Sequence, residues 1–175
     1  MNLPNFLSVS RILLVLPIIL LFENGFYLAS LISLIVASLT DYFDGFFARK
    51  KNQTSNIGAL LDLLADKLFV SILLIWITFN FDSLLILVSS ILIISREISI
   101  SYLRLFIISQ NKKIDEVKSN LLGKYKTAFQ MIGLGLTLIS PISPDFILNL
   151  SISLLMFSAL ISWYSLIKYL NKWIV

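Results

Sequence analysis

The chain has 175 residues, of which 58% are hydrophobic and only 14% are charged. An average soluble domain is roughly 45–50% apolar and about 25% charged, so this chain has too few polar residues to cover a soluble fold. It contains no cysteine and no histidine, which excludes disulfides, thiolate nucleophiles, imidazole bases and zinc sites built on these residues. We expect an integral membrane protein. In such a chain the net charge of +4 reports topology and contact with anionic lipid, not a nucleic acid partner.

Six apolar stretches come close to the length of about 20 residues that a helix needs to cross a bilayer. They predict helices at 7–22, 26–49, 57–79, 83–108, 124–140 and 146–170. The polar breaks between them are short and leave no room for a second, soluble domain. The first stretch lacks a basic n-region and a small-residue cleavage site, so we interpret it as a retained span. The expected fold is an all-α bundle of six transmembrane helices that forms a single domain over residues 1–175.

The charge distribution predicts the orientation of this bundle. If residue 1 is cytoplasmic, the connections near residues 24, 81 and 143 face outward; they hold Glu23, Asp82 and Asp145 and no lysine or arginine. All fourteen basic residues then fall in the inward half. Because cytoplasmic loops of membrane proteins carry the excess of Lys and Arg, we expect a multi-pass protein of the cell membrane with both termini in the cytoplasm.

Four aspartates lie near the cytoplasmic connection between the second and third predicted helices. Asp41 and Asp44 are three residues apart, and Asp62 and Asp66 are four apart, so each pair lies on one helix face. The short connection makes the helices antiparallel, which lets the acidic faces meet. Four carboxylates in one pocket repel each other unless cations lie among them, and ligation by oxygen alone selects a hard ion. We expect Mg²⁺ or Mn²⁺ at this site, as two ions.

A structural alternative pairs these aspartates with Arg49 and Lys67. Gly45 and Gly58 favour a ligand site, because they remove side-chain bulk where a ligand approaches the backbone, although glycine also permits close helix packing. Arg49 supplies a planar fork suited to a phosphate group.

Residues 41–66 read DYFDGFFARKKNQTSNIGALLDLLAD. This segment resembles, at every fixed position, the signature of the CDP-alcohol phosphatidyltransferase family, D-x2-D-G-x2-A-R-x8-G-x3-D-x3-D. Four further segments look like the branch of the family that uses glycerol 3-phosphate: LPNFLSVSR, LADKL, ISREISISYLR and GKYKTAFQM. Leu63 departs from this branch, whose members usually have proline there; the change affects local helix geometry and not a ligand.

The resemblance implies an enzyme that binds CDP-diacylglycerol from the membrane, transfers its phosphatidyl group to an alcohol and releases CMP. It also implies a homodimer. By this resemblance Asp41, Asp44 and Asp62 are metal ligands, and Asp66 is a ligand, the general base, or both. The CDP-diacylglycerol site would be formed by Asp41, Gly45, Ala48, Arg49 and Gly58.

A second group of polar residues lies in the fourth and fifth predicted helices. Arg96 and Arg104 are eight residues apart, about 80° around a helix, so both can reach one cavity. We expect them to bind the phosphate of glycerol 3-phosphate, aided by Lys124 or Lys126. In the alternative interpretation Glu97 simply pairs with Arg104, seven residues further along.

The expected reaction joins CDP-diacylglycerol and sn-glycerol 3-phosphate to give phosphatidylglycerophosphate and CMP, a step of phospholipid biosynthesis. Within the same class the acceptor could instead be inositol phosphate, serine or a phospholipid such as phosphatidylglycerol. A divalent-cation transporter is the alternative from a different class. That alternative predicts acids spread toward the membrane midplane and does not need Gly45, Ala48 and Arg49.

Overall fold

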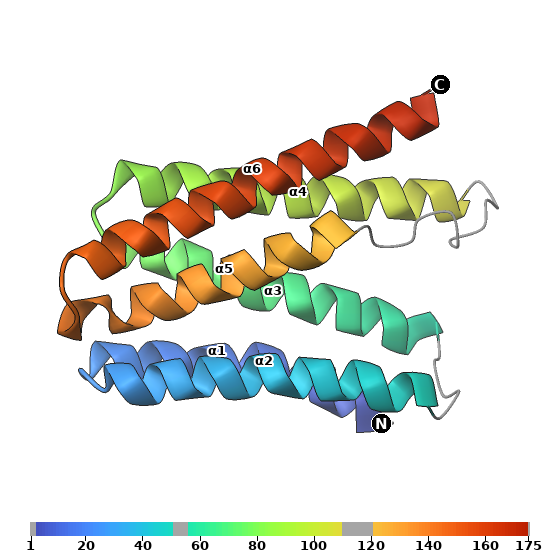
Figure 1. The fold of residues 1–175 in the computed structure, drawn as a ribbon. Helices are drawn as coiled ribbons and strands as arrows, with labels where there is room; N and C mark the ends of the chain where they lie inside the picture. The colour runs from blue at the N-terminus through green and yellow to red at the C-terminus, as the bar shows by residue number, and fades with distance from the viewer. Residues whose placement is uncertain (1–2, 51–55, 110–120, 175) are drawn as a thin grey trace. The chain divides into compact units, whose positions relative to one another are not determined.

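The computed structural model describes the backbone of residues 3–50, 56–109 and 121–174, and the side chains of residues 12–39, 64–65, 67–103, 125–168 and 170–171. All regular structure in these ranges is helical (Figure 1). The elements are α1 (Leu3–Glu23), α2 (Tyr27–Lys50), α3 (Asn56–Asn80), α4 (Leu84–Ser109), α5 (Leu121–Ile139), a short 3₁₀ turn η2 (Ser140–Ile142) and α6 (Phe146–Ile174).

The six predicted helices are confirmed as helices. The largest differences are at the chain ends, where α1 begins at Leu3 instead of residue 7 and α6 ends at Ile174 instead of residue 170. The α5 helix ends at Ile139, and the 3₁₀ turn that follows contains Pro141. Proline lacks a backbone N–H and clashes with the preceding turn, so it favours the end of a helix at this point.

The chain forms two compact units. The first contains Met1–Ile77 and Leu138–Asp145, and its helices α1, α2 and α3 alternate in direction (Figure 1). The second contains Thr78–Thr137 and Phe146–Val175; here α4 and α6 run in the same direction and α5 runs opposite to both. Within the first unit α1 packs against α2, and within the second α4 packs against α6.

A tight turn around Gly25 joins α1 to α2. Gly25 has φ of +80°, a conformation that glycine adopts without strain. The backbone N–H of Phe26 donates to the carbonyl of Leu21, and that of Gly25 donates to the carbonyl of Phe22, both at 2.8 Å. This is the Schellman pattern, which satisfies the last carbonyls of a helix and reverses the chain.

The faces of α1 and α2 that meet in the first unit are buried at helical spacing. On α1 these positions are Val15, Ile18 and Phe22. On α2 they include Ser30, whose hydroxyl is fully buried and donates to the carbonyl of Ile18 at 2.8 Å, followed by Leu34. A small hydroxyl residue thus allows close approach of the two helices and links them through one hydrogen bond.

In the second unit, too, small hydroxyl residues are buried between the helices, and among the described side chains there are more of them. Ser89, Ser151 and Ser158 are buried, whereas Leu85, Leu150 and Leu160 on the same helices are exposed. A soluble protein places its large aliphatic residues inside. Small polar residues between the helices with large aliphatic residues outside are typical of helices that pack in lipid.

Among the helical stretches whose side chains the structure describes, two are long and apolar enough to cross a membrane, Leu84–Leu103 and Phe146–Lys168. Shorter apolar helical stretches with described side chains are Ile12–Glu23, Tyr27–Leu39 and Lys67–Asn80. These lengths support membrane association, and the six spans remain a prediction.

Candidate active site

The four predicted metal ligands lie on two consecutive helices of the first unit. Asp41 and Asp44 are near the C-terminal end of α2, and Asp62 and Asp66 are near the N-terminal end of α3. Both helices are continuous through these positions, so the spacings of three and four residues place each pair on one helix face. The side chains of all four residues lie outside the described ones.

The expected nucleotide-site residues occupy the same two helix ends. Gly45, Ala48 and Arg49 lie on α2, and Gly58 lies in the first turn of α3. Their side-chain surroundings also lie outside the described residues. The α3 helix is regular through Leu63, the position at which the related branch usually has proline. Among side chains that the structure describes, no group of three or more acidic residues is placed to hold a metal ion.

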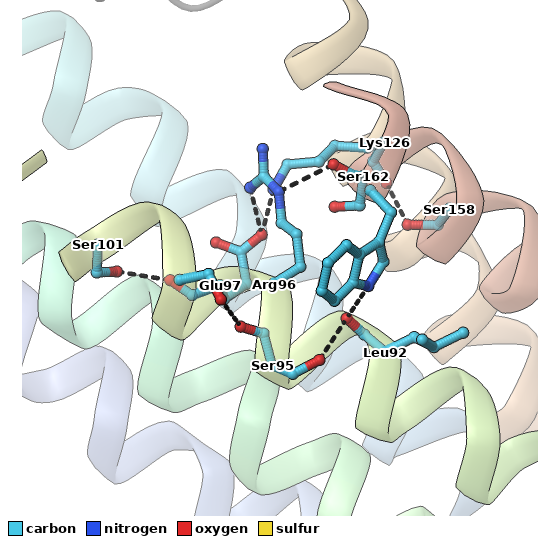
Figure 2. Close-up of polar contacts among 10 residues, drawn as sticks. Leu92, Ser95, Arg96, Glu97, Ser101, Lys126, Ser158 and Ser162 are labelled. Carbon is cyan, nitrogen blue, oxygen red and sulfur yellow. Dashed lines mark hydrogen bonds and ion pairs between the residues drawn. The ribbon is translucent and has the colours of Figure 1, made fainter. Parts of the chain in front are cut away.

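Figure 2 shows a polar cluster in the second unit that consists of Arg96 and Glu97 of α4 and Lys126 of α5. The Glu97 carboxylate accepts a hydrogen bond from Arg96 Nη1 at 2.9 Å and a second one from Lys126 Nζ. The three side chains are only 7%, 16% and 10% exposed, respectively. Among the described side chains, two cations therefore share one carboxylate in a largely buried place.

Hydrogen bonds to α6 hold the two basic residues of this cluster. Arg96 Nε donates to the backbone carbonyl of Ser162 at 3.1 Å, and the Ser158 hydroxyl donates to the backbone carbonyl of Lys126 at 2.9 Å. A third bond ties α6 to α4, because the indole N–H of Trp163 donates to the carbonyl of Leu92 at 2.9 Å. The cluster is thus built by three helices of one unit.

The structure brings together two of the four residues predicted for the acceptor phosphate. Arg96 and Lys126 meet at Glu97, whereas Arg104 on α4 and Lys124 on α5 have side chains outside the described set. The pairing of Glu97 with Arg104 considered above therefore remains untested, and Glu97 has two other cationic partners. Sequence reasoning missed this arrangement because consecutive helix residues do not normally face each other.

One buried side-chain nitrogen on the Lys126 side of α5 has no hydrogen-bond partner among the described residues. Gln130 lies one turn after Lys126 on α5 and is 5% exposed. Its Nε2 makes no hydrogen bond in the described part of the chain. Residues four apart on a helix lie on the same face, so the Gln130 amide is on the Lys126 side of α5.

Comparison with known proteins supports the resemblance of residues 41–66. Residues 1–168 match the CDP-alcohol phosphatidyltransferase family. A relative from Wigglesworthia glossinidia brevipalpis is 38% identical over 172 residues, which cover 97% of this chain and 93% of the relative. Relatives from Sodalis glossinidius (strain morsitans) and Salmonella choleraesuis (strain SC-B67) are 34% and 32% identical over 173 residues, with the same coverage.

All three relatives carry the name CDP-diacylglycerol--glycerol-3-phosphate 3-phosphatidyltransferase. The similarity extends over both units and includes the segment with the eight signature positions. The chain belongs to the CDP-alcohol phosphatidyltransferase family.

Proposed function

We propose that this protein transfers the phosphatidyl group of CDP-diacylglycerol to sn-glycerol 3-phosphate, which gives phosphatidylglycerophosphate and CMP. The observation that carries this proposal is the similarity over 97% of the chain to relatives named for this reaction. The eight signature residues on α2 and α3 agree with it. In the reaction an acceptor hydroxyl loses its proton, its oxygen bonds to the phosphorus of the phosphatidyl group, and the bond from that phosphorus to the CMP oxygen breaks.

The residues Asp41, Asp44, Asp62 and Asp66 would hold Mg²⁺ or Mn²⁺, as two ions. Their chemistry fits such ions: all donors are carboxylate oxygens, and the continuous helices keep each pair on one face. When bound, the metal neutralises the diphosphate, polarises the phosphorus and stabilises the leaving CMP. Asp66 would also accept the proton of the attacking hydroxyl, since a carboxylate within hydrogen-bond reach can serve as a general base.

The donor site would lie on the same two helix ends. Gly45 and Gly58 have no side chains and leave room for the nucleotide close to the backbone, and Ala48 adds little bulk. The Arg49 guanidinium is suited to a phosphate oxygen pair, because its planar fork donates two parallel hydrogen bonds. Asp41 completes the set of residues expected around CDP-diacylglycerol.

The acceptor phosphate would bind in the second unit at Arg96 and Lys126, together with Arg104 and Lys124. Two features of the described cluster support this. Its described side chains are two cations and one carboxylate, which suits an anion, and the Arg96 nitrogen Nη2 makes no hydrogen bond to any described residue, which leaves one donor edge for a ligand. Hydrogen bonds between charged groups contribute about 1.5–3 kcal/mol each, enough for a marked preference for a phosphorylated acceptor.

The membrane arrangement that we propose has six spans, both termini and the aspartates on the cytoplasmic side, and a homodimer as the assembled form. The exposed leucines of the described helices support contact with lipid, and the absence of Lys and Arg near Glu23, Asp82 and Asp145 supports the orientation. We further propose that CDP-diacylglycerol enters its site sideways from the membrane. Its acyl chains then stay in hydrocarbon, which avoids a cost of about 0.8 kcal/mol per exposed CH₂.

The decisive experiment measures CMP release by the purified protein from CDP-diacylglycerol with Mg²⁺ or Mn²⁺. We expect release only when glycerol 3-phosphate is added, and a lipid product with the mass of phosphatidylglycerophosphate. Serine, inositol phosphate and phosphatidylglycerol serve as control acceptors. Release that needs one of these alcohols, or that does not depend on any acceptor, would overturn the proposed reaction.

A matched substitution tests the assignment of the two substrate sites. Replacement of Arg104 by Gln should raise the KM for glycerol 3-phosphate, while the KM for CDP-diacylglycerol changes little. The rise should correspond to a loss of up to ~2 kcal/mol in binding free energy. An equal increase of both KM values would mean that Arg104 has a structural role.

A further inference from the structure

We propose that Glu97 is the positioning residue of the acceptor site: its carboxylate fixes Arg96 and Lys126 so that both point their charge at the phosphate of the acceptor. This inference rests on the proposed function and adds a residue that the signature does not contain. It is carried by the bridge itself, because the carboxylate accepts from Arg96 Nη1 at 2.9 Å and from Lys126 Nζ, and so links α4 to α5 (Figure 2).

The geometry of Arg96 shows that its side chain is held in a specific orientation. Arg96 and Glu97 are consecutive on α4, and consecutive side chains leave a helix in different directions. Their contact therefore requires the arginine side chain to turn back toward Glu97. The guanidinium is fixed at a second point by the carbonyl of Ser162, so two of its three nitrogens are engaged. The third nitrogen keeps a defined direction as a result.

Lys126 is fixed in a similar way at both ends. Its backbone carbonyl accepts the Ser158 hydroxyl at 2.9 Å, and its ammonium group donates to Glu97. Without a partner, a lysine side chain has four flexible bonds and loses about 2 kcal/mol of rotamer entropy when it is ordered. The bridge supplies this order before the ligand arrives, which lowers the entropic cost of binding.

Glu97 is itself negative, so removal of its charge has two opposing effects on phosphate binding. Loss of the carboxylate would raise the net charge of the cluster and, in water, strengthen the attraction for a phosphate. In a place where the three side chains are at most 16% exposed, however, the two cations repel each other more strongly once the carboxylate between them is lost. They would move apart or turn toward solvent. We therefore expect the loss of orientation to outweigh the gain in charge.

The experiment uses the full-length protein and steady-state kinetics with both substrates. Glu97→Gln keeps the shape of the side chain and removes its charge; we expect the KM for glycerol 3-phosphate to rise about tenfold, on the scale of one charged hydrogen bond. The values of kcat and of the KM for CDP-diacylglycerol should change less than about twofold, since the donor site is on other helices. Glu97→Asp should restore part of the affinity, because it returns the charge.

A matched control and a double-mutant cycle separate positioning from general damage. Ser99→Ala, two residues away, removes a hydroxyl that bonds only within α4, to the carbonyl of Ser95 at 2.8 Å, and should leave all constants unchanged. The effects of Glu97→Gln and Lys126→Gln on the KM for glycerol 3-phosphate should be clearly less than additive, because each breaks the same bridge. If the Gln variant does not fold, Glu97→Asp takes its place: its shorter side chain weakens the bridge without removing the charge, so the rise in the same KM should be smaller and its effect together with Lys126→Gln should still be less than additive.

The outcomes separate this inference from the proposed reaction. If the wild-type protein does not use glycerol 3-phosphate at all, the proposed reaction is wrong. If the wild type is active but Glu97→Gln leaves the KM for glycerol 3-phosphate unchanged or lowers it, the reaction stands and the positioning role is refuted. An equal rise of the KM values for both substrates refutes it as well. Additive effects in the cycle would also refute it.

Discussion

The close contact of α5 with α6 at Gly133 allows a quantitative prediction for Gly133→Ala. A Cβ atom added at this position would lie 2.9 Å from Cγ and 3.0 Å from Cδ2 of Leu155, and 3.4 Å from the backbone oxygen of Ser151. Carbon atoms in good contact are about 3.5–4.0 Å apart. Leu155 is fully buried, so its side chain cannot move into solvent to make room.

Hydrogen bonds at the same point restrict a shift of the helices. The carbonyl of Gly133 accepts the Thr137 hydroxyl at 2.9 Å and the Ser151 hydroxyl at 3.0 Å, and these two hydroxyls lie 2.5 Å apart. Separation of α5 from α6 by a few tenths of an ångström would lengthen the bond from Ser151. The added methyl group must therefore be accommodated mainly by strain in Leu155.

The expected magnitude combines two opposing terms. Overpacking of a tight core costs about 1–3 kcal/mol, whereas alanine is more favourable than glycine in a helix by roughly 0.5–1 kcal/mol. We expect a net loss of about 1–2 kcal/mol, which for a chain of this size lowers the melting temperature by about 2–8 °C. Thermal unfolding in detergent measures this value directly.

A second substitution, at Leu155, tests whether contact with this side chain causes the predicted loss of stability. Leu155→Ala removes both side-chain atoms that the new Cβ would meet, so Gly133→Ala should cost less in the Leu155→Ala background than in the wild type. A Gly133→Ala variant as stable as the wild type, or equal costs in both backgrounds, would refute the packing argument.

Three further predictions address the metal site, a buried amide and the orientation. Asp44→Asn should abolish CMP release without a change in melting temperature, and EDTA should do the same reversibly; normal turnover in either case contradicts the metal proposal. Gln130→Met should raise the melting temperature by removing an unsatisfied buried donor worth about 1–3 kcal/mol, and a lower temperature would show that this amide has a partner in the folded protein. The chain has no cysteine, so Asn24→Cys should react in intact cells with a membrane-impermeant thiol reagent and Asn52→Cys only after the membrane is opened; the reverse pattern would invert the topology.

The positions of the helices were predictable because apolar stretches and polar breaks alternate clearly along this chain. The break Glu23-Asn24-Gly25, for example, coincides with the Gly25 turn between α1 and α2. The aspartate pairs were predictable for a different reason: spacings of three and four residues fix a common face on any continuous helix. Membrane insertion, the metal ions and the dimer remain predictions.

The Glu97 bridge was not predictable from the sequence, because tertiary packing decides it. Spacing along α4 suggested Arg104 as a partner for Glu97, yet the described contacts come from the adjacent Arg96 and from Lys126 on another helix. The partner of Trp163 is likewise decided by tertiary packing and not by its position in the sequence. Tryptophans of a membrane chain are commonly interfacial anchors, whereas the Trp163 indole bonds to the backbone of α4.

The serine hydroxyls differ in when their hydrogen bonds can form during biosynthesis. Ser33, Ser38, Ser99 and Ser153 donate to carbonyls four residues earlier in their own helices, so these bonds exist as soon as each helix forms. Such a helix can enter lipid alone without an unsatisfied hydroxyl. Ser30 and Ser158 instead donate to neighbouring helices and gain these partners only on association. Hydroxyls that bond within their own helix thus lower the cost of placing a single helix in the bilayer. Hydroxyls that bond to another helix favour association between that specific pair of inserted helices.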